Sequence, residues 1–170
     1  MKKQIKIVAI LLSVICALPL FAACEKKPQK EERSRYEITA TYDEERKTVT
    51  ASMSLSYYNG TEAILDKLCF HLYPAAFREG ARFSPVPKDA VSSAYPAGLS
   101  YGGIEIGKTT LGGAEVATSI EGEDEDILVV KMSGEGLYPT ERAELTVDFT
   151  LTLPEIRHRF GYQGSRVNLG

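Results

Sequence analysis

Apolar and hydroxyl-bearing residues alternate along the stretch that follows Lys47. The apolar positions are Val49, Ala51, Met53, Leu55 and Tyr57, and a Thr or Ser separates each from the next. Successive side chains of a β-strand point to opposite faces, so this alternation gathers the apolar residues on one face. The sequence therefore predicts a strand with one buried face and one face of hydroxyl groups.

A tight turn is predicted directly after this strand, at Asn59-Gly60, because this pair tolerates the positive φ angles of a two-residue reversal. A second strand follows, in which Leu68, Phe70 and Leu72 share one face. We therefore predict a β-hairpin made of these two strands.

The same alternation predicts further strands on both sides. They cover residues 36–42, 104–106, 115–121, 127–132 and 144–153, with turns at 43–46, at Gly112-Gly113, at 122–126 and around Pro139. About seven or more short strands, and no amphipathic helix outside the N-terminal segment, are typical of an antiparallel β-sandwich. The predicted fold class is all-β, with the sandwich domain over residues 36–154.

Two segments lack this alternation. Between Pro74 and Ser100, three prolines at 85, 87 and 96 disfavour any long strand or helix, and only residues 88–95 could form a helical turn or two. Such a connection is either functional or an insertion packed on the surface. After Pro154 the alternation ends, and we expect residues 155–170 to begin the connection to a further domain, so that the chain is a fragment.

The N-terminus has the pattern of a secretory signal. Lys2, Lys3 and Lys6 precede an apolar run that ends in small residues just before Cys24. Residues 1–23 are predicted to be the signal peptide of a bacterial lipoprotein, with Cys24 as the lipidated first residue; an ordinary signal peptide with an incidental cysteine is the alternative. Residues 24–35 are charged and form a predicted tether. We expect the protein to be exported and lipid-anchored on the outer face of a membrane.

Charge and cysteine content narrow the function further. Without the three lysines of the signal, 17 basic residues face 23 acidic ones, and an acidic chain lacks the positive surface that nucleic-acid binding requires. Of the three cysteines, only Cys69 would remain free in the mature domain, which excludes an internal disulfide there. The stability of the domain is expected to come from its apolar core.

Three segments together resemble the N-terminal β-domain of zinc metallopeptidases of the aminopeptidase N (gluzincin) family, particularly bacterial lipoprotein members. These segments are LDKLCFHLYPAAF at 65–77, the turn LYPTE at 137–141 before a long alternating strand, and Leu153-Pro154 at the end of that strand. The resemblance implies a saddle-like sandwich without catalytic residues of its own, which braces a catalytic domain and lines its peptide cleft. It also implies that zinc and HExxH belong to that catalytic domain, which this chain lacks.

One substrate-cleft residue is implied by the same resemblance. In some relatives a glutamine near the end of this domain reaches into the cleft, and Gln163 in the segment GYQGSR lies in about that region. The neighbouring Arg and Pro-Cys spacing of those relatives is not reproduced here.

Four other groups of residues suggest chemistry, each beside a structural explanation. Cys69 and His71 share a strand face, but two ligands do not make a zinc site. The acidic turn at 121–126 lacks the ligand spacing of a calcium loop, which favours a solvated hairpin tip. The basic group of Arg157, His158, Arg159 and Arg166 suits either an acidic partner surface or a solvated linker. Asn59-Gly60-Thr61 matches a glycosylation acceptor, although the predicted hairpin turn explains it.

Two other functions remain open on the sequence alone. A free-standing cell-surface binding module would explain the export signal, the tether and the lack of catalytic residues, although the chain has no Trp to build a sugar-binding platform. A lipoprotein with a purely structural role would fit the same features.

Overall fold

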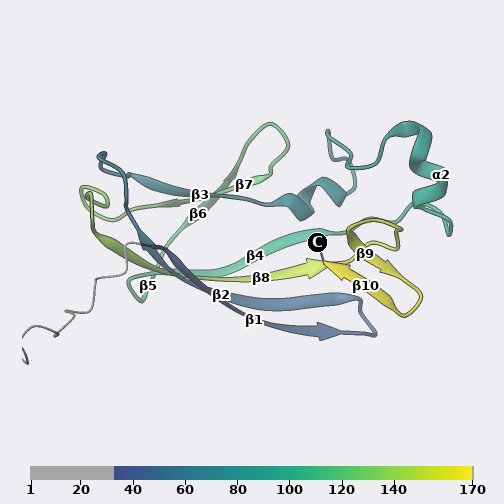
Figure 1. Ribbon diagram of the computed structural model, residues 1–170, viewed down its shortest axis with the longest axis horizontal. Helices are drawn as coiled ribbons and strands as arrows, with labels where there is room; N and C mark the ends of the chain where they lie inside the picture. Colours follow the sequence, from purple (N-terminus) through teal and green to yellow (C-terminus); the bar gives the residue numbers. More distant parts are fainter. Residues whose placement is uncertain (1–32, 170) are drawn as a thin grey trace, which may run out of the picture. The chain divides into compact units, whose positions relative to one another are not determined.

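The computed structural model describes residues 33–169, and this part of the chain is all-β, as predicted (Figure 1). Its ten strands are β1 (Arg35–Asp43), β2 (Thr48–Tyr58), β3 (Lys67–His71), β4 (Gly103–Leu111), β5 (Ala114–Glu115), β6 (Thr118–Glu121), β7 (Ile127–Lys131), β8 (Arg142–Thr152), β9 (Phe160–Gln163) and β10 (Arg166–Leu169). No helix among the described residues is long and apolar enough to span a membrane. The predicted signal peptide, Cys24 and residues 24–32 of the predicted tether lie outside the described residues.

The strands form two main antiparallel sheets that pack face to face. The larger sheet has the order β1-β2-β8-β4-β5, the smaller one β3-β7-β6, and β9 and β10 form a separate two-stranded hairpin. Figure 1 shows the smaller sheet as a second layer over part of the larger one. The antiparallel sandwich predicted from the sequence is therefore confirmed.

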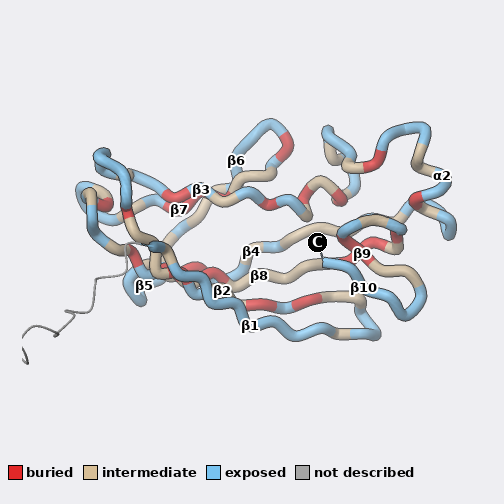
Figure 2. The backbone as a smooth tube through the Cα atoms, viewed as in Figure 1, coloured by how far each residue is buried: buried red, intermediate tan, exposed pale blue. Residues whose placement is uncertain are grey.

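The apolar faces predicted for β2 and β8 form the main core between the sheets. Leu55 from β2 and Leu145 and Val147 from β8 pack with Leu68 and Val130 from the smaller sheet. Leu55 and Leu145 are direct neighbours in the register of the two strands. The buried positions recur at every second residue along these strands (Figure 2), as a half-buried strand requires.

The hairpin predicted at Asn59-Gly60 is not present, because β2 and β3 belong to different sheets. β2 pairs with β1 and β8, whereas β3 pairs with β7. Neither Asn59 nor Gly60 has a positive φ angle. The segment between the strands crosses from one sheet to the other, and Asn59 is fully buried at this crossing.

The strand predicted over residues 115–121 is two short strands in different sheets. β5 ends at Glu115 on the edge of the larger sheet, and β6 starts at Thr118 on the edge of the smaller one. Between them, the backbone N–H of Val116 donates to the carbonyl of Thr109. Alternation continues through this crossing, which explains why the sequence pattern suggested one element. The glycine turn at Gly112-Gly113 is present, with both φ angles positive.

A second core cluster contains the connection between β3 and β4. This connection has three short helical turns, η2 (Tyr73–Phe77), η3 (Lys88–Ala90) and α2 (Val91–Ala94). Phe77, Val86 and Ala94 from it are buried with Val49 and Leu153. The connection therefore packs against the body of the domain, and it also supplies residues to the two cavities described below.

The segment after Pro154 is folded, although no strand was predicted there. Ile156 and Phe160 are buried in the second core cluster, and β9 and β10 pair through a turn at Gly164. Gly161 has a φ angle of 137° and lies so close to Ile156 and Pro154 that a Cβ atom would overlap them. A close approach of this kind requires glycine. Whether residues 155–170 lead to a further domain stays a prediction.

Candidate functional site

An open cleft lies between the two sheets, at the side where both have a free strand edge. Its volume is about 830 Å³. Beyond the short pairing with β5 and the bond from Val116 to Thr109, the outer edge of β4 has no strand partner from Gly103 to Lys108 among the described residues, and β6 is an edge strand of the smaller sheet. The cleft is lined by Leu72, Ala75, Arg78, Tyr101, Gly102, Gly103, Ile104, Glu105, Ile106, Thr118, Ile120, Glu125 and Thr152. We call it the intersheet cleft.

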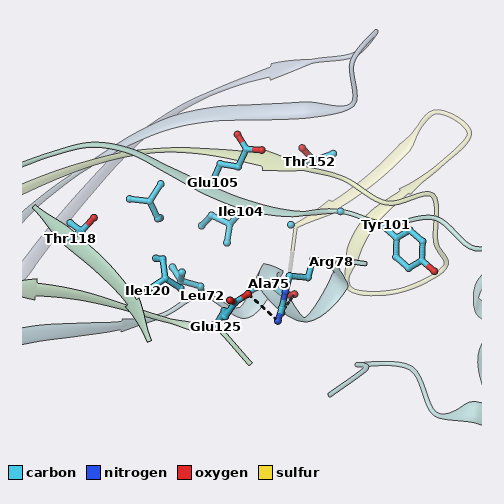
Figure 3. A pocket seen from close by; sticks show the side chains of 13 residues that line it. Leu72, Ala75, Arg78, Tyr101, Ile104, Glu105, Thr118, Ile120, Glu125 and Thr152 are labelled. Carbon is cyan, nitrogen blue, oxygen red and sulfur yellow. Dashed lines mark hydrogen bonds and ion pairs between the residues drawn. The ribbon is translucent and has the colours of Figure 1, made fainter. Parts of the chain in front are cut away.

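Apolar side chains from the two layers face each other across the intersheet cleft (Figure 3). Leu72 and Ile120 lie on the side of the smaller sheet, and Ile104 lies opposite on β4. Ile120 is 44% exposed, which is high for an apolar residue on an inner face. The cleft is therefore a part of the sandwich interior that the chain's own side chains leave open.

The charged groups at one mouth of the cleft pair with each other. The guanidinium of Arg78 lies 2.8 Å from a carboxylate oxygen of Asp124 and 3.6 Å from one of Glu125. Arg78 also donates to the carbonyl of Ala75 at the end of η2. With its donors used in this way, Arg78 closes the mouth instead of offering a free cation to a ligand.

Asp124 is the buried member of the acidic turn, which corrects the prediction of a solvated hairpin tip. Its carboxylate accepts hydrogen bonds from the backbone N–H of Arg82 at 2.8 Å and of Phe83 at 2.9 Å, in addition to the bond from Arg78. The two backbone donors hold the pKa of Asp124 below its usual value; burial opposes this shift and Arg78 adds to it. Asp124 thus fastens residues 78–83 of the long connection to the β6–β7 turn. Glu121, Glu123 and Glu125 are exposed.

Cys69 and His71, the candidate pair of metal ligands in the sequence, lie on a solvated face of β3. Cys69 and His71 are both exposed on β3, and the His71 ring stacks on Tyr73 with centroids 5.4 Å apart. No group of three or more His, Cys, Asp or Glu side chains in residues 33–169 is placed to hold a metal ion. Asn59, whose triplet with Gly60 and Thr61 matches a glycosylation acceptor, is inaccessible in this fold because its side chain is buried and hydrogen-bonded.

A second, more apolar groove lies beside the C-terminal hairpin. Its volume is about 630 Å³, and it is lined by Tyr73, Pro74, Ala76, Phe77, Pro85, His158, Arg159, Phe160 and Leu169. The His158 ring packs edge-on against Phe77, and its Nδ1 is buried with no hydrogen-bond partner among the described residues. Tyr73 and Leu169 are 77% and 54% exposed. We call this surface the hairpin groove.

The predicted basic group surrounds the hairpin but does not form one cluster. Arg157, Arg159 and Arg166 are exposed, and none of them forms an ion pair within the described part of the chain. Gln163 is the last residue of β9 and lines a shallow cavity of about 390 Å³ together with Arg157 and Arg166. The hairpin therefore presents a glutamine and two unpaired arginines at one end of the domain.

Sequence reasoning missed the residues that shape both grooves. Phe77 and Arg78 lie in the connection where alternation had stopped, so no periodic signal marked them. The one available signal was the segment YPAAFR, whose Pro74 in the first turn favours a short helix.

No family model matches the chain, and searches of curated proteins and of solved structures find no significant match either. The resemblance to aminopeptidase N-like enzymes therefore stays a prediction made from the residues of the sequence.

Proposed function

We propose that this chain is the non-catalytic N-terminal domain of an exported, lipid-anchored zinc metallopeptidase of the aminopeptidase N type. In this role the sandwich braces the catalytic domain and lines one side of the peptide cleft. Zinc is bound by the catalytic domain, and Cys24 carries the lipid that holds the protein at the outer face of a bacterial membrane.

The hairpin groove is the observation that carries this proposal. It lies next to the last described residues, and its lining is mostly apolar. Tyr73 and Leu169 expose side chains that a domain without partners usually covers. An apolar surface beside the segment that leads onward in the chain is suited to packing against the next domain.

The polar groups of the hairpin fit the second part of the proposal. Gln163 and Arg166 face each other in the first pair of the β9–β10 register. A glutamine amide can donate to and accept from a peptide backbone, and an unpaired arginine binds a carboxylate. These are groups that a peptide cleft uses to hold the substrate chain.

Sequencing the reading frame beyond Gly170 tests the proposal directly. We expect several hundred further codons that contain HExxH and a downstream glutamate as the third zinc ligand. A stop codon at this point, or a long continuation without that motif, would refute the proposal.

The extended protein allows a test of the groove itself. Tyr73→Glu should lower the thermal stability of the two-domain protein and its aminopeptidase activity, because it places a charge in the domain interface. Leu99→Glu is the matched control, since Leu99 is an apolar residue outside the groove that is 65% exposed, against 77% for Tyr73. Equal effects of the two changes would argue against the groove as the interface.

A free-standing binding module is the second candidate, and the intersheet cleft is the observation that favours it. Tyr101 is 47% exposed at the rim of an open cavity, and exposed aromatic rings stack on sugars. Saturable binding to a glycan array that is lost in Tyr101→Ala would favour this function, whereas a flat response would remove it.

A further inference from the structure

β1 is an edge strand whose outer side has no partner within the described residues. It is the first strand of the larger sheet and pairs only with β2 over its nine residues. It contains no proline and no bulge, and every residue except Asp43 is exposed. A long, regular and unprotected edge is a template for pairing with another strand.

The inner face of β1 is apolar yet uncovered. Tyr36, Ile38 and Tyr42 are 55%, 58% and 40% exposed. The register places them beside core-facing residues of β2, with Tyr36 opposite Leu55 and Tyr42 opposite Val49. Directly opposed residues of an antiparallel pair lie on the same face of the sheet. These side chains thus belong to the core face of the sheet, and the second layer does not cover them.

The sequence of β1, RYEITATYD, has compatible residues at equal distances on either side of Thr39. If β1 pairs antiparallel with β1 of a second copy around Thr39, Arg35 of one copy lies opposite Asp43 of the other. The same register puts Tyr36 opposite Tyr42, Ile38 opposite Ala40 and Glu37 opposite Thr41. Opposite charges and aromatic pairs are the cross-strand combinations that stabilise antiparallel sheets.

We propose that β1 is a self-association site at which two copies of this chain pair edge to edge, with a two-fold axis at Thr39. The pairing joins the two five-stranded sheets into one continuous antiparallel sheet. Each self-complementary contact occurs twice, as a two-fold interface requires. The proposal does not depend on the proposed function, since it uses only the exposed edge and its sequence.

The charged groups around this edge are compatible with the pairing. Arg35 is 3.9 Å from Glu37 of its own strand, and both side chains are about three-quarters exposed. Asp43 accepts hydrogen bonds from the N–H groups of Glu45 and Arg46 and pairs with the Arg46 side chain at 3.5 Å. Glu37 of one copy lies diagonal to Asp43 of the other, whereas the residue directly opposite that Asp43 is Arg35, so no like charges are directly opposed.

The contact is small for a specific interface. Nine residues of strand extend for about 30 Å, and interfaces that bury less than about 1,200 Å² in total are typical of weak or transient association. We therefore expect a reversible dimer that dissociates on dilution.

A charge exchange tests the register. The full chain is purified in detergent micelles, and sedimentation equilibrium at matched solvent density gives the mass of the protein alone. Arg35→Asp and Asp43→Arg each place like charges opposite one another at both ends of the interface, so each variant alone should dimerise at least tenfold more weakly. An equimolar mixture of the two should form heterodimers, in which both pairs are again opposite in sign. Lys88→Asp, an equal charge change at an exposed site outside β1, should leave dimerisation unchanged.

A cysteine scan tests the axis independently of charge and of the turn that Asp43 supports. In a chain whose three native cysteines are replaced by serine, Thr39→Cys should form a disulfide-linked dimer under mild oxidation, whereas Thr41→Cys alone should not. A monomeric wild-type chain, unchanged dimerisation of Arg35→Asp, or equal cross-linking at both positions would each overturn the proposal. If a different surface covers β1, such as a second domain, the wild-type chain is monomeric and the proposal fails.

Discussion

Replacement of Asn59 tests whether the crossing between the sheets is a specific hydrogen-bonded joint. Its side-chain amide donates to the carbonyls of Ala63 and Leu137, both at 2.9 Å, and its carbonyl accepts from the N–H and hydroxyl of Thr61 at 3.0 and 2.7 Å. The backbone adds two further bonds, from Asn59 to Glu141 and from Thr140 to Asn59. One buried residue thus links the end of β2 to the turn before β8.

The expected cost follows from what each substitution leaves behind. In Asn59→Ala, water can replace the amide at the exposed residues Thr61 and Ala63, and the carbonyl of Leu137 keeps its bond from the N–H of Leu65. The bond to Leu137 is then the one lost without replacement by water, at about 1 kcal/mol, and the shorter side chain also leaves a small cavity. We therefore expect the free energy of unfolding to fall by about 2–3 kcal/mol in total.

Asn59→Asp should cost more, although it is nearly isosteric. The carboxylate cannot donate, so its oxygen faces two carbonyl oxygens at hydrogen-bond distance, and the charge is buried without a cation. Leaving such a charge uncompensated costs about 3–5 kcal/mol. Protonation at acidic pH returns one donor, so the difference from Asn59→Ala should narrow as the pH falls.

Urea unfolding of the full chain at pH 7 and pH 4.5 measures both variants. With a urea dependence of about 2 kcal/mol per molar, Asn59→Asp should lower the midpoint at pH 7 by about 2 M, and Asn59→Ala by about 1 M. Ser92→Asp is the control, because Ser92 is exposed and surface changes stay within about 0.5 kcal/mol. If Asn59→Asp is as stable as the wild type, or more stable than Asn59→Ala at pH 7, the crossing does not depend on the amide donor.

Three further predictions concern other parts of the fold. Because the pKa of Asp124 is lowered by folding, its contribution to stability is full at neutral pH and is lost as the pH falls through its folded-state pKa. Asp124→Asn should therefore make the free energy of unfolding less dependent on pH in the acidic range, and it should speed amide exchange in residues 79–84. An unchanged pH dependence would contradict this. Gly102→Ala should destabilise the fold by several kcal/mol, because its Cβ would overlap the last carbonyl of β8. Gly113→Ala has open space around it and should lose only about 1 kcal/mol for its positive φ angle. Thermal unfolding measures both changes. Cys69 should react with maleimide in the native state as fast as in urea, since it is exposed; slow native labelling would show that another surface covers β3.

Strands with sustained alternation were predictable from the sequence because the period of two is a local property. β1, β2 and β8 begin and end within two residues of the predicted bounds. The partner of each strand was not predictable in the same way. Asn59-Gly60 has the composition of a hairpin turn, but its amide is committed to Leu137, a residue 78 positions away. At this position the long-range hydrogen bond, and not the local turn preference, determines the path of the backbone.

The two grooves depend on contacts that alternation cannot encode. Phe77 is buried because it meets Phe160 at 5.1 Å, from a segment more than 80 residues later in the chain. Neither residue belongs to a periodic pattern, so alternation predicted the strand members of the second core cluster, Val49 and Leu153, but not the residues that pack on them. The arginines of the hairpin were found from the sequence, but only the structure separates them into individual exposed groups.

The edge strand β1 shows what alternation along a strand predicts and what it leaves undetermined. The pattern of Tyr36, Ile38, Ala40 and Tyr42 predicts one buried face, and the strand is present where expected, yet three of these side chains are at least 40% exposed. Amphipathic alternation indicates which face of a strand is suited to burial, but it does not say whether the same chain supplies the cover. In β2 and β8 the smaller sheet and the connection between β3 and β4 supply it. In β1 the described residues leave Tyr36, Ile38 and Tyr42 at least 40% exposed, and this exposure is the observation behind the proposed self-association site.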